Sequence, residues 1–88
     1  MKPIRRSTQF KKDYKRVKKS GKNLAELKQV INKLVHDENL EPKYRDHALI
    51  GNYAGCRECH LEPDWLLIYK TSSCELSLVR TGSHSALF

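Results

Sequence analysis

Residues 65–69 read WLLIY, an unbroken apolar run that decides the fold of this 88-residue chain. An apolar run of this length that is followed by a charged residue, here Lys70, is typical of a strand buried on both faces of a sheet. The preceding residues 62–64 read EPD, and proline and aspartate are residues that a tight turn prefers. The sequence therefore predicts a central strand over residues 65–70.

Two further strands are predicted, one on each side of this run. Residues 56–61 alternate in the manner of a strand, and residues 75–81 are rich in residues that favour β-structure. Residues 71–74 read TSSC and supply the turn between the central strand and the last one. Strands joined by turns this short pair antiparallel, so the three form a meander. Residues 2–6 are predicted as a short first strand.

The first helix is predicted after Ser7, which is a suitable N-cap. Phe10, Tyr14 and Val17 follow at i, i+4 and i+7, so they share one narrow face of a helix whose remaining surface is mostly basic. Residues 20–21, Ser-Gly, end this helix, because glycine readily takes the left-handed conformation found at helix C-termini.

The second helix is predicted to begin after Asn23, which has the spacing of a capping box with Glu26. Its apolar residues recur with a helical period and make it the main contributor to the core: Leu24, Leu27, Val30, Ile31, Leu34 and Val35. Residues 42–55 contain two glycines, a proline and no sustained period. They predict a long, partly packed loop.

Together these segments predict one α+β domain over residues 1–88. Its order is strand, helix, helix and loop, followed by an antiparallel sheet of three to four strands, with both helices packed on one side of the sheet. A chain of this length buries only about 60% of the surface that its unfolded form exposes, so it has room for one core.

The net charge of +7 is unevenly distributed. Residues 1–22 carry ten Lys or Arg against one acid, whereas residues 23–88 carry seven basic and nine acidic residues. A basic block of this kind attracts phosphate polyanions, although a solvated helix face is also basic. The candidate contacts in this block are Lys11, Lys12, Lys15, Arg16, Lys18 and Lys19.

Composition and the N-terminal sequence exclude several classes of protein. The chain has no run of 18 apolar residues, so no membrane span is predicted. The first ten residues are charged and lack the apolar region of a signal peptide, so we expect a cytoplasmic protein. Disulfides are not expected there, and three cysteines, an odd number, do not form a framework of pairs.

Residues 55–60 read GCRECH and contain the Cys-x-x-Cys-His signature of covalent haem attachment. On the predicted strand, however, Cys56 and Cys59 point to opposite faces and cannot both reach one porphyrin. The only methionine is Met1, so the usual second axial ligand is missing. The chain also lacks the paired spacings of a zinc site. We therefore predict no haem, no metal site and no other cofactor, with both cysteines as small strand fillers.

Three histidines and one aspartate in the second half of the chain form a candidate catalytic set: His47, His60, Asp64 and His84. Each histidine alone would be an ordinary surface residue, as we expect for His36. Together they suit RNA cleavage without a metal, which needs a base for the ribose 2′-OH and an acid for the leaving 5′-oxygen. Arg80 would neutralise the phosphorane, and the rings of Trp65 and Phe88 would stack on bases.

Two longer stretches carry a resemblance to a known family. Residues 44–70 read YRDHALIGNYAGCRECHLEPDWLLIYK, and residues 78–88 read LVRTGSHSALF. They resemble the YafQ branch of the RelE/ParE toxin superfamily through the combination of D-H, R-E-x-H-x-x-P-D-W and R-T-G-S-H with a terminal L-F. The order and length of the N-terminal elements agree with that family as well.

The resemblance implies a RelE-like fold and a ribosome-dependent mRNA endonuclease, the toxin of a type II toxin–antitoxin pair. Such a protein acts on mRNA in the ribosomal A site and is silenced by a cognate antitoxin. The matching positions imply that the acid–base set consists of His47, His60, Asp64 and His84. His84 is expected to be the general acid, and the resemblance leaves the base open among the other three.

By the same resemblance, Trp65 and Phe88 are aromatic residues needed for activity, Arg80 contacts phosphate, and the basic block binds ribosomal RNA or an acidic antitoxin. The alternative is a non-catalytic member of the superfamily that binds an antitoxin, the ribosome or DNA gyrase, because a fold alone does not fix an activity. The three histidines favour the nuclease, since a gyrase-directed protein has no need of them.

Overall fold

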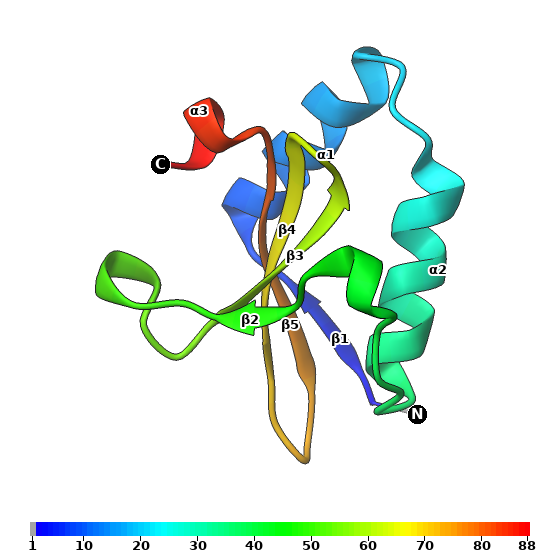
Figure 1. Ribbon diagram of the computed structural model, residues 1–88, viewed down its shortest axis with the longest axis vertical. Helices are drawn as coiled ribbons and strands as arrows, with labels where there is room; N and C mark the ends of the chain where they lie inside the picture. The colour runs from blue at the N-terminus through cyan, green and yellow to red at the C-terminus, as the bar shows by residue number, and fades with distance from the viewer. Residues whose placement is uncertain (1) are drawn as a thin grey trace.

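The computed structural model describes residues 2–88 and contains a five-stranded sheet with helices on both faces (Figure 1). The strands are β1 (Ile4–Arg6), β2 (His47–Ala48), β3 (Arg57–Glu62), β4 (Trp65–Thr71) and β5 (Leu76–Gly82). The helices are α1 (Thr8–Lys19), α2 (Leu24–Val35) and α3 (His84–Leu87), and the 3₁₀ turns are η1 (Pro42–Tyr44) and η2 (Gly51–Tyr53). No helix in this described part of the chain is long and apolar enough to cross a bilayer.

The strands lie in the order β1-β5-β4-β3-β2. Strands β2 to β5 pair antiparallel, whereas β1 runs parallel to β5. The antiparallel part therefore has four strands, within the predicted three to four. Helices α1 and α2 pack on the same face of the sheet (Figure 1), so the predicted α+β architecture is confirmed.

Local hydrogen bonds begin both long helices where the sequence predicts. Ser7 Oγ accepts from the backbone N–H three residues later at 2.9 Å and begins α1. Gly21, just after α1, has a φ of 81°, which glycine tolerates better than any other residue. Asn23 caps the start of α2, where its Oδ1 accepts from Ala25 N–H at 3.1 Å. The predicted capping box had Glu26 as the partner instead.

Strand β4 is buried on both faces, as its apolar sequence predicts. The exposed fraction is 0% for Trp65, Leu66, Leu67 and Ile68 and 2% for Tyr69. Trp65, Leu67 and Tyr69 pack into the main core beneath α1 and α2. Leu66 and Ile68 form a second cluster with Leu87 of α3. The sheet thus has one face covered by the long helices and a second face covered only in part.

Strand β3 places its side chains alternately on these two faces. Cys59 and Leu61 lie in the main core, whereas Cys56, just before the strand, packs against the second cluster. The two cysteines therefore lie on opposite faces, as predicted, and both are free thiols. Burial raises the pKa of the Cys59 thiol to about 12, so the thiol stays protonated at neutral pH. Glu58 and His60 are left for the second face.

The segment predicted as a long, partly packed loop, residues 42–55, contains three short elements that were not predicted: η1, β2 and η2. Strand β2 has only two residues and exists through its pairing with β3. Helix α3 has four residues and was not predicted either. Elements this short show no period in the sequence. Strands β3, β4 and β5 each end one residue later than predicted, and β1 begins at Ile4 rather than at Lys2.

Replacing Leu67 by alanine should lower the free energy of unfolding by about 2–5 kcal/mol, because it opens a cavity at a fully buried position. Urea denaturation followed by circular dichroism measures this loss. Ile50→Ala is the control: its side chain is 91% exposed, and we expect a change below about 0.5 kcal/mol. Equal stability of the two variants would contradict the central position of β4.

Candidate active site

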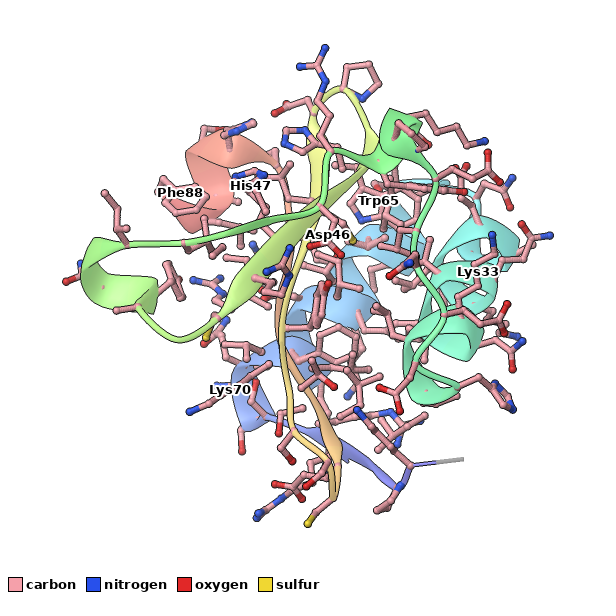
Figure 2. The ribbon with its side chains drawn as sticks, turned by 60° about the horizontal axis from the view of Figure 1, so that its bottom comes forward. Lys33, Asp46, His47, Trp65, Lys70 and Phe88 are labelled. Carbon is pink, nitrogen blue, oxygen red and sulfur yellow. The ribbon has the colours of Figure 1, made fainter. Side chains whose placement is uncertain are left out.

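Three imidazole rings gather on the second face of the sheet, and each comes from a different element. His47 lies in β2, His60 in β3 and His84 at the start of α3. The ring centroids of His47 and His60 are 6.1 Å apart, and those of His60 and His84 are 5.7 Å apart. Figure 2 shows His47 and Phe88 close to α3. The expected convergence of the three histidines is confirmed, and their roles remain predictions.

The pairing of β2 with β3 brings His47 against Glu58, a residue that the sequence analysis did not select. The two residues are direct cross-strand partners, and His47 Nε2 lies 2.9 Å from Glu58 Oε2. The Glu58 side chain is only 6% exposed. Its other oxygen, Oε1, has no hydrogen-bond partner within residues 2–88. Glu58 could have been selected from the sequence, because side chains alternate along a strand and Glu58 therefore shares a face of the predicted strand with His60.

The hydrogen bonds of His47 fix where its protons lie. The ring nitrogen Nδ1 is 2.6 Å from the carbonyl oxygen of Arg45. A carbonyl oxygen only accepts, so Nδ1 carries a hydrogen and donates it. The contact of 2.9 Å between Nε2 and Glu58 Oε2 also requires a hydrogen. His47 and Glu58 therefore share a proton between Nε2 and Oε2.

The residue before His47 anchors the segment that carries this imidazole. Asp46 Oδ1 accepts from Arg57 Nε–H at 2.7 Å, and Asp46 Oδ2 accepts from the hydroxyl of Tyr69. The hydrogen bond to Asp46 raises the pKa of Arg57, so this ion pair persists at any physiological pH. Both partners of Asp46 belong to the sheet, on β3 and β4. His47 is therefore held at a fixed place although its own strand is short.

Asp64 holds the start of α3, and with it His84. The backbone N–H of His84 donates to Asp64 Oδ1 at 3.1 Å, and the ring nitrogen Nδ1 of His84 lies 3.5 Å from the same oxygen. The backbone hydrogen bond, helped by the imidazole, lowers the pKa of the Asp64 carboxyl. Asp64 is therefore ionised near neutral pH and orients His84.

Arg80 of β5 is fixed by an aspartate of α1, the helix that packs against that strand. Asp13 of α1 is 1% exposed and accepts from Arg80 Nε–H at 2.9 Å and from Nη2–H at 3.1 Å. Burial raises the pKa of the Asp13 carboxyl, but the hydrogen bonds from Arg80, Gln9 and Thr81 outweigh burial and lower it. Asp13 in turn raises the pKa of Arg80. Three of the five guanidinium N–H groups remain for another partner.

The two aromatic residues predicted to stack on bases have different environments. The prediction for Trp65 was wrong, because its side chain is 0% exposed and its Nε1–H donates to Thr81 Oγ1 at 2.9 Å. Trp65 supports β5 beside Arg80 from within the core. Phe88 is 62% exposed, 6.1 Å from the His84 ring and 5.5 Å from the Tyr53 ring, both between centroids. Its ring is free to stack on a base.

Two sets of basic residues lie apart from each other. Lys43 and Arg45 line a pocket of about 530 Å³ together with His60 and His84. Three of the six candidate contacts in the basic block line a groove between α1 and α2 instead: Lys11, Lys15 and Lys18. Because α1 and α2 cover the opposite face of the sheet, this groove does not adjoin the three imidazoles.

Comparison by sequence places the chain among bacterial toxins. A family model described as "Bacterial toxin of type II toxin-antitoxin system, YafQ" matches residues 2–88. The mRNA interferase toxin YafQ of Escherichia coli (strain K12) is 42% identical over 86 residues, which make up 97% of this chain and 94% of that protein.

Comparison by structure gives the same relatives. YafQ in the E. coli DinJ–YafQ complex superposes with a TM-score of 0.92 at 40% identity, covering 100% of this chain and 99% of that chain. A metal-bound toxin from Helicobacter pylori superposes with a TM-score of 0.93 at 46% identity, covering 100% of both chains.

Replacing Asp13 by asparagine should lower the free energy of unfolding by about 3–5 kcal/mol at pH 7, because it breaks a buried ion pair. The pKa of Asp13 is lowered in the folded protein. Its stabilisation is therefore present above the unfolded pKa of about 3.9 and is lost as the pH falls through the lower, folded value. Urea denaturation at pH 7 and at pH 3 measures both effects.

Asp37→Asn is the matched control for this experiment. Asp37 pairs with Lys2 at 2.5 Å, but its side chain is 69% exposed. An exposed pair contributes about 0–1 kcal/mol, so we expect little change. If both variants lost the same small amount, Asp13 would not be the anchor of Arg80.

Proposed function

The chain belongs to the YafQ family of toxins from bacterial type II toxin–antitoxin systems, and from this premise we propose that it is an mRNA interferase that cleaves ribosome-bound mRNA. The single observation that supports the proposal best is the convergence of imidazoles from three separate segments. The activity in the name of the E. coli relative agrees with it. The non-catalytic alternative leaves this arrangement without a use.

His84 is the general acid in this proposal. Its side chain is 53% exposed, so a leaving 5′-oxygen can approach the ring. Asp64 lies on the Nδ1 side and orients the ring, which leaves Nε2 to face the substrate. An imidazole can deliver a proton near neutral pH, and general acid–base help of this kind is worth about 10²–10⁴-fold in rate.

The base belongs to the group formed by His47, Glu58 and His60. His60 lies between the other two rings, so a nucleotide placed over it reaches both the acid and the base. Both ring nitrogens of His47 carry or share a hydrogen, so the proton of the ribose 2′-OH goes to the imidazole of His60 or to Oε1 of Glu58, which has no partner within residues 2–88. Asp64, which the sequence left as a possible base, instead positions His84.

The remaining groups bind and orient RNA. Arg80 has free N–H groups and neutralises the charge on the phosphorane. Phe88 stacks on a base beside His84. Lys43 and Arg45 contact the next phosphate along the strand from the wall of the pocket. A pocket this open suits a single strand presented in the ribosomal A site better than a duplex.

Cleavage in this scheme needs no metal ion, because side chains supply both proton transfers and the positive charge. A metal-bound relative is known from H. pylori.

His84→Ala should reduce cleavage of ribosome-bound mRNA by about 10²–10⁴-fold and abolish growth arrest on induction, because it removes the general acid. Primer extension on mRNA from a purified translation mix measures the cuts, with the toxin treated with EDTA beforehand. His36→Ala is the control, since His36 is exposed and lies outside the site, at the C-cap of α2. Undiminished cleavage by a folded His84→Ala variant would refute the assignment.

We further propose that the cognate antitoxin inserts an amphipathic acidic helix into the groove between α1 and α2. This groove of about 780 Å³ has an apolar floor that includes Phe10, Leu27 and Ile31. Every charged residue that lines it is basic, and these are Arg6, Lys11, Lys15, Lys18 and Lys28. An apolar floor suits a protein helix rather than RNA, and the cationic rim selects one with acidic flanks. The E. coli relative is known in complex with the antitoxin DinJ.

Lys15→Glu should weaken binding of the cognate antitoxin, because it reverses one charge on the rim of the groove. Lys12→Glu is a matched control: it makes the same change on the same helix at an exposed position that does not line the groove. Titration calorimetry of each variant with the antitoxin compares them. Equal losses for the two variants would indicate attraction by net charge alone and would remove the groove as the docking site.

A further inference from the structure

We propose that Tyr53 is a positioning residue for RNA cleavage: it holds the C-terminal end of α3, so that the ring of Phe88 and the guanidinium of Arg80 meet the substrate in fixed places. Its role in cleavage rests on the proposed nuclease function, whereas its contacts do not. Tyr53 lies in η2, a turn of three residues beside α3 (Figure 1). The segment around it shows no sustained period in the sequence, so no pattern selects this tyrosine.

Helix α3 is too short to be stable without contacts from outside. It has four residues, and isolated helices shorter than about 12–15 residues are marginal in water. Its start is held by Asp64, which accepts from the backbone N–H of His84 at 3.1 Å. That hydrogen bond does not reach Phe88, which follows the helix and is 62% exposed. The end of α3 therefore needs a second anchor.

Tyr53 contacts this end of α3 with its ring and with its hydroxyl. Its ring centroid is 5.5 Å from that of Phe88 at an interplanar angle of 78°, the edge-to-face arrangement that aromatic pairs prefer. Its hydroxyl points to the carbonyl oxygen of Leu87, 3.5 Å away. The ring also packs against the second cluster of the sheet, formed by Leu66, Ile68 and Leu87. Tyr53 thus joins the end of α3 to the sheet.

The hydroxyl of Tyr53 also connects this end of α3 to Arg80. Nε–H and Nη2–H of Arg80 donate to Asp13. The pKa of Arg80 is raised by this hydrogen bond and, against a lowering by burial, by a further hydrogen bond with the Tyr53 hydroxyl. Asp13 fixes the guanidinium from α1, and Tyr53 fixes it from the side of the candidate site. The guanidinium has five N–H groups, so others remain for a phosphate.

The segment that carries Tyr53 is closed by backbone hydrogen bonds. The N–H of Leu49 donates to the carbonyl oxygen of Cys56 at 3.0 Å, and the N–H of Cys56 donates to the carbonyl oxygen of Tyr53 at 2.9 Å. Gly51 and Gly55 have φ values of 73° and 88°, which glycine adopts more readily than other residues. A residue that positions substrate-binding groups must itself be fixed. These bonds fix the backbone of Tyr53.

The two groups that Tyr53 holds affect different kinetic parameters. A base stacks on Phe88 in the bound substrate as well as in the transition state, so a misplaced Phe88 ring raises KM. Arg80 meets charge that develops on the phosphorane, so a misplaced guanidinium lowers kcat. Tyr53→Phe keeps the ring and loses the hydroxyl, whereas Tyr53→Ala loses both. The first variant should therefore change kcat alone, and the second should change both parameters.

Steady-state cleavage of ribosome-bound mRNA measures this division. We expect Tyr53→Phe to keep KM within about twofold of the parent and to lower kcat about threefold or more. Tyr53→Ala should in addition raise KM about fivefold or more. Asn52→Ala, an exposed neighbour on η2, is the control and should match the parent. Tyr53→Leu, with the same expected rise in KM, replaces Tyr53→Ala if that variant does not fold.

The division between KM and kcat separates positioning from a loss of stability. A smaller folded fraction lowers kcat and leaves KM in place. An unchanged KM in the variant without the aromatic ring would overturn the positioning of Phe88, and an unchanged kcat in Tyr53→Phe would overturn that of Arg80. In a Phe88→Ala background, Tyr53→Ala should raise KM no further. A further rise would overturn a positioning role, because Tyr53 would then contact RNA itself.

Backbone amide relaxation by NMR tests the anchor without RNA. We expect an order parameter of about 0.85 at Phe88 in the parent and below about 0.6 in Tyr53→Ala. His84 should stay rigid in both, because Asp64 still holds it. An unchanged order parameter at Phe88 would overturn the anchor. If the parent cut no RNA, the proposed nuclease function would be at fault, and the relaxation data would still decide whether Tyr53 holds α3.

Discussion

Five residues of β4, Trp65 to Tyr69, are buried on both faces of the sheet, and this double burial organises the rest of the molecule. One face of β4 needs the apolar stripes of α1 and α2 to cover it, and these helices form the main core. The other face receives only the short α3 and the segment around η2. Because this face is covered only in part, polar side chains of β2, β3 and α3 reach solvent there. The three imidazoles lie in this uncovered part of the face.

Two buried carboxylates, those of Asp13 and Glu58, hold residues of the candidate site. Each contacts a residue that is distant from it in the sequence. Asp13 belongs to the helix-covered side but holds Arg80 and the backbone of Thr81. Glu58 lies under the imidazole of His47 and keeps one oxygen without a partner. A buried charge costs stability unless it is paired, so both positions are explained better by function than by packing. The first orients Arg80, which we propose to be a phosphate contact, and the second holds His47.

The division of the sheet also separates the partners that we propose for this toxin. The groove between α1 and α2 has a basic rim and lies over one face, whereas the histidines lie on the other. An antitoxin helix in the groove does not cover the catalytic groups by itself. Its acidic flanks instead compete with RNA for the positive charge of residues 1–22.

The sequence by itself determined the α+β class, the two long helices with their N-caps, the central position of β4 and the opposite orientation of Cys56 and Cys59. Each of these depends on local periodicity or capping, which neighbouring residues set among themselves. It also selected His47, His60 and His84, whose convergence the structure bears out. Only the tertiary structure decided that Trp65 is buried, that Asp13 anchors Arg80 and that β2 brings His47 to Glu58. These three facts are contacts between residues 11 to 67 positions apart, and no local pattern in a chain specifies which distant side chains will meet once the core closes.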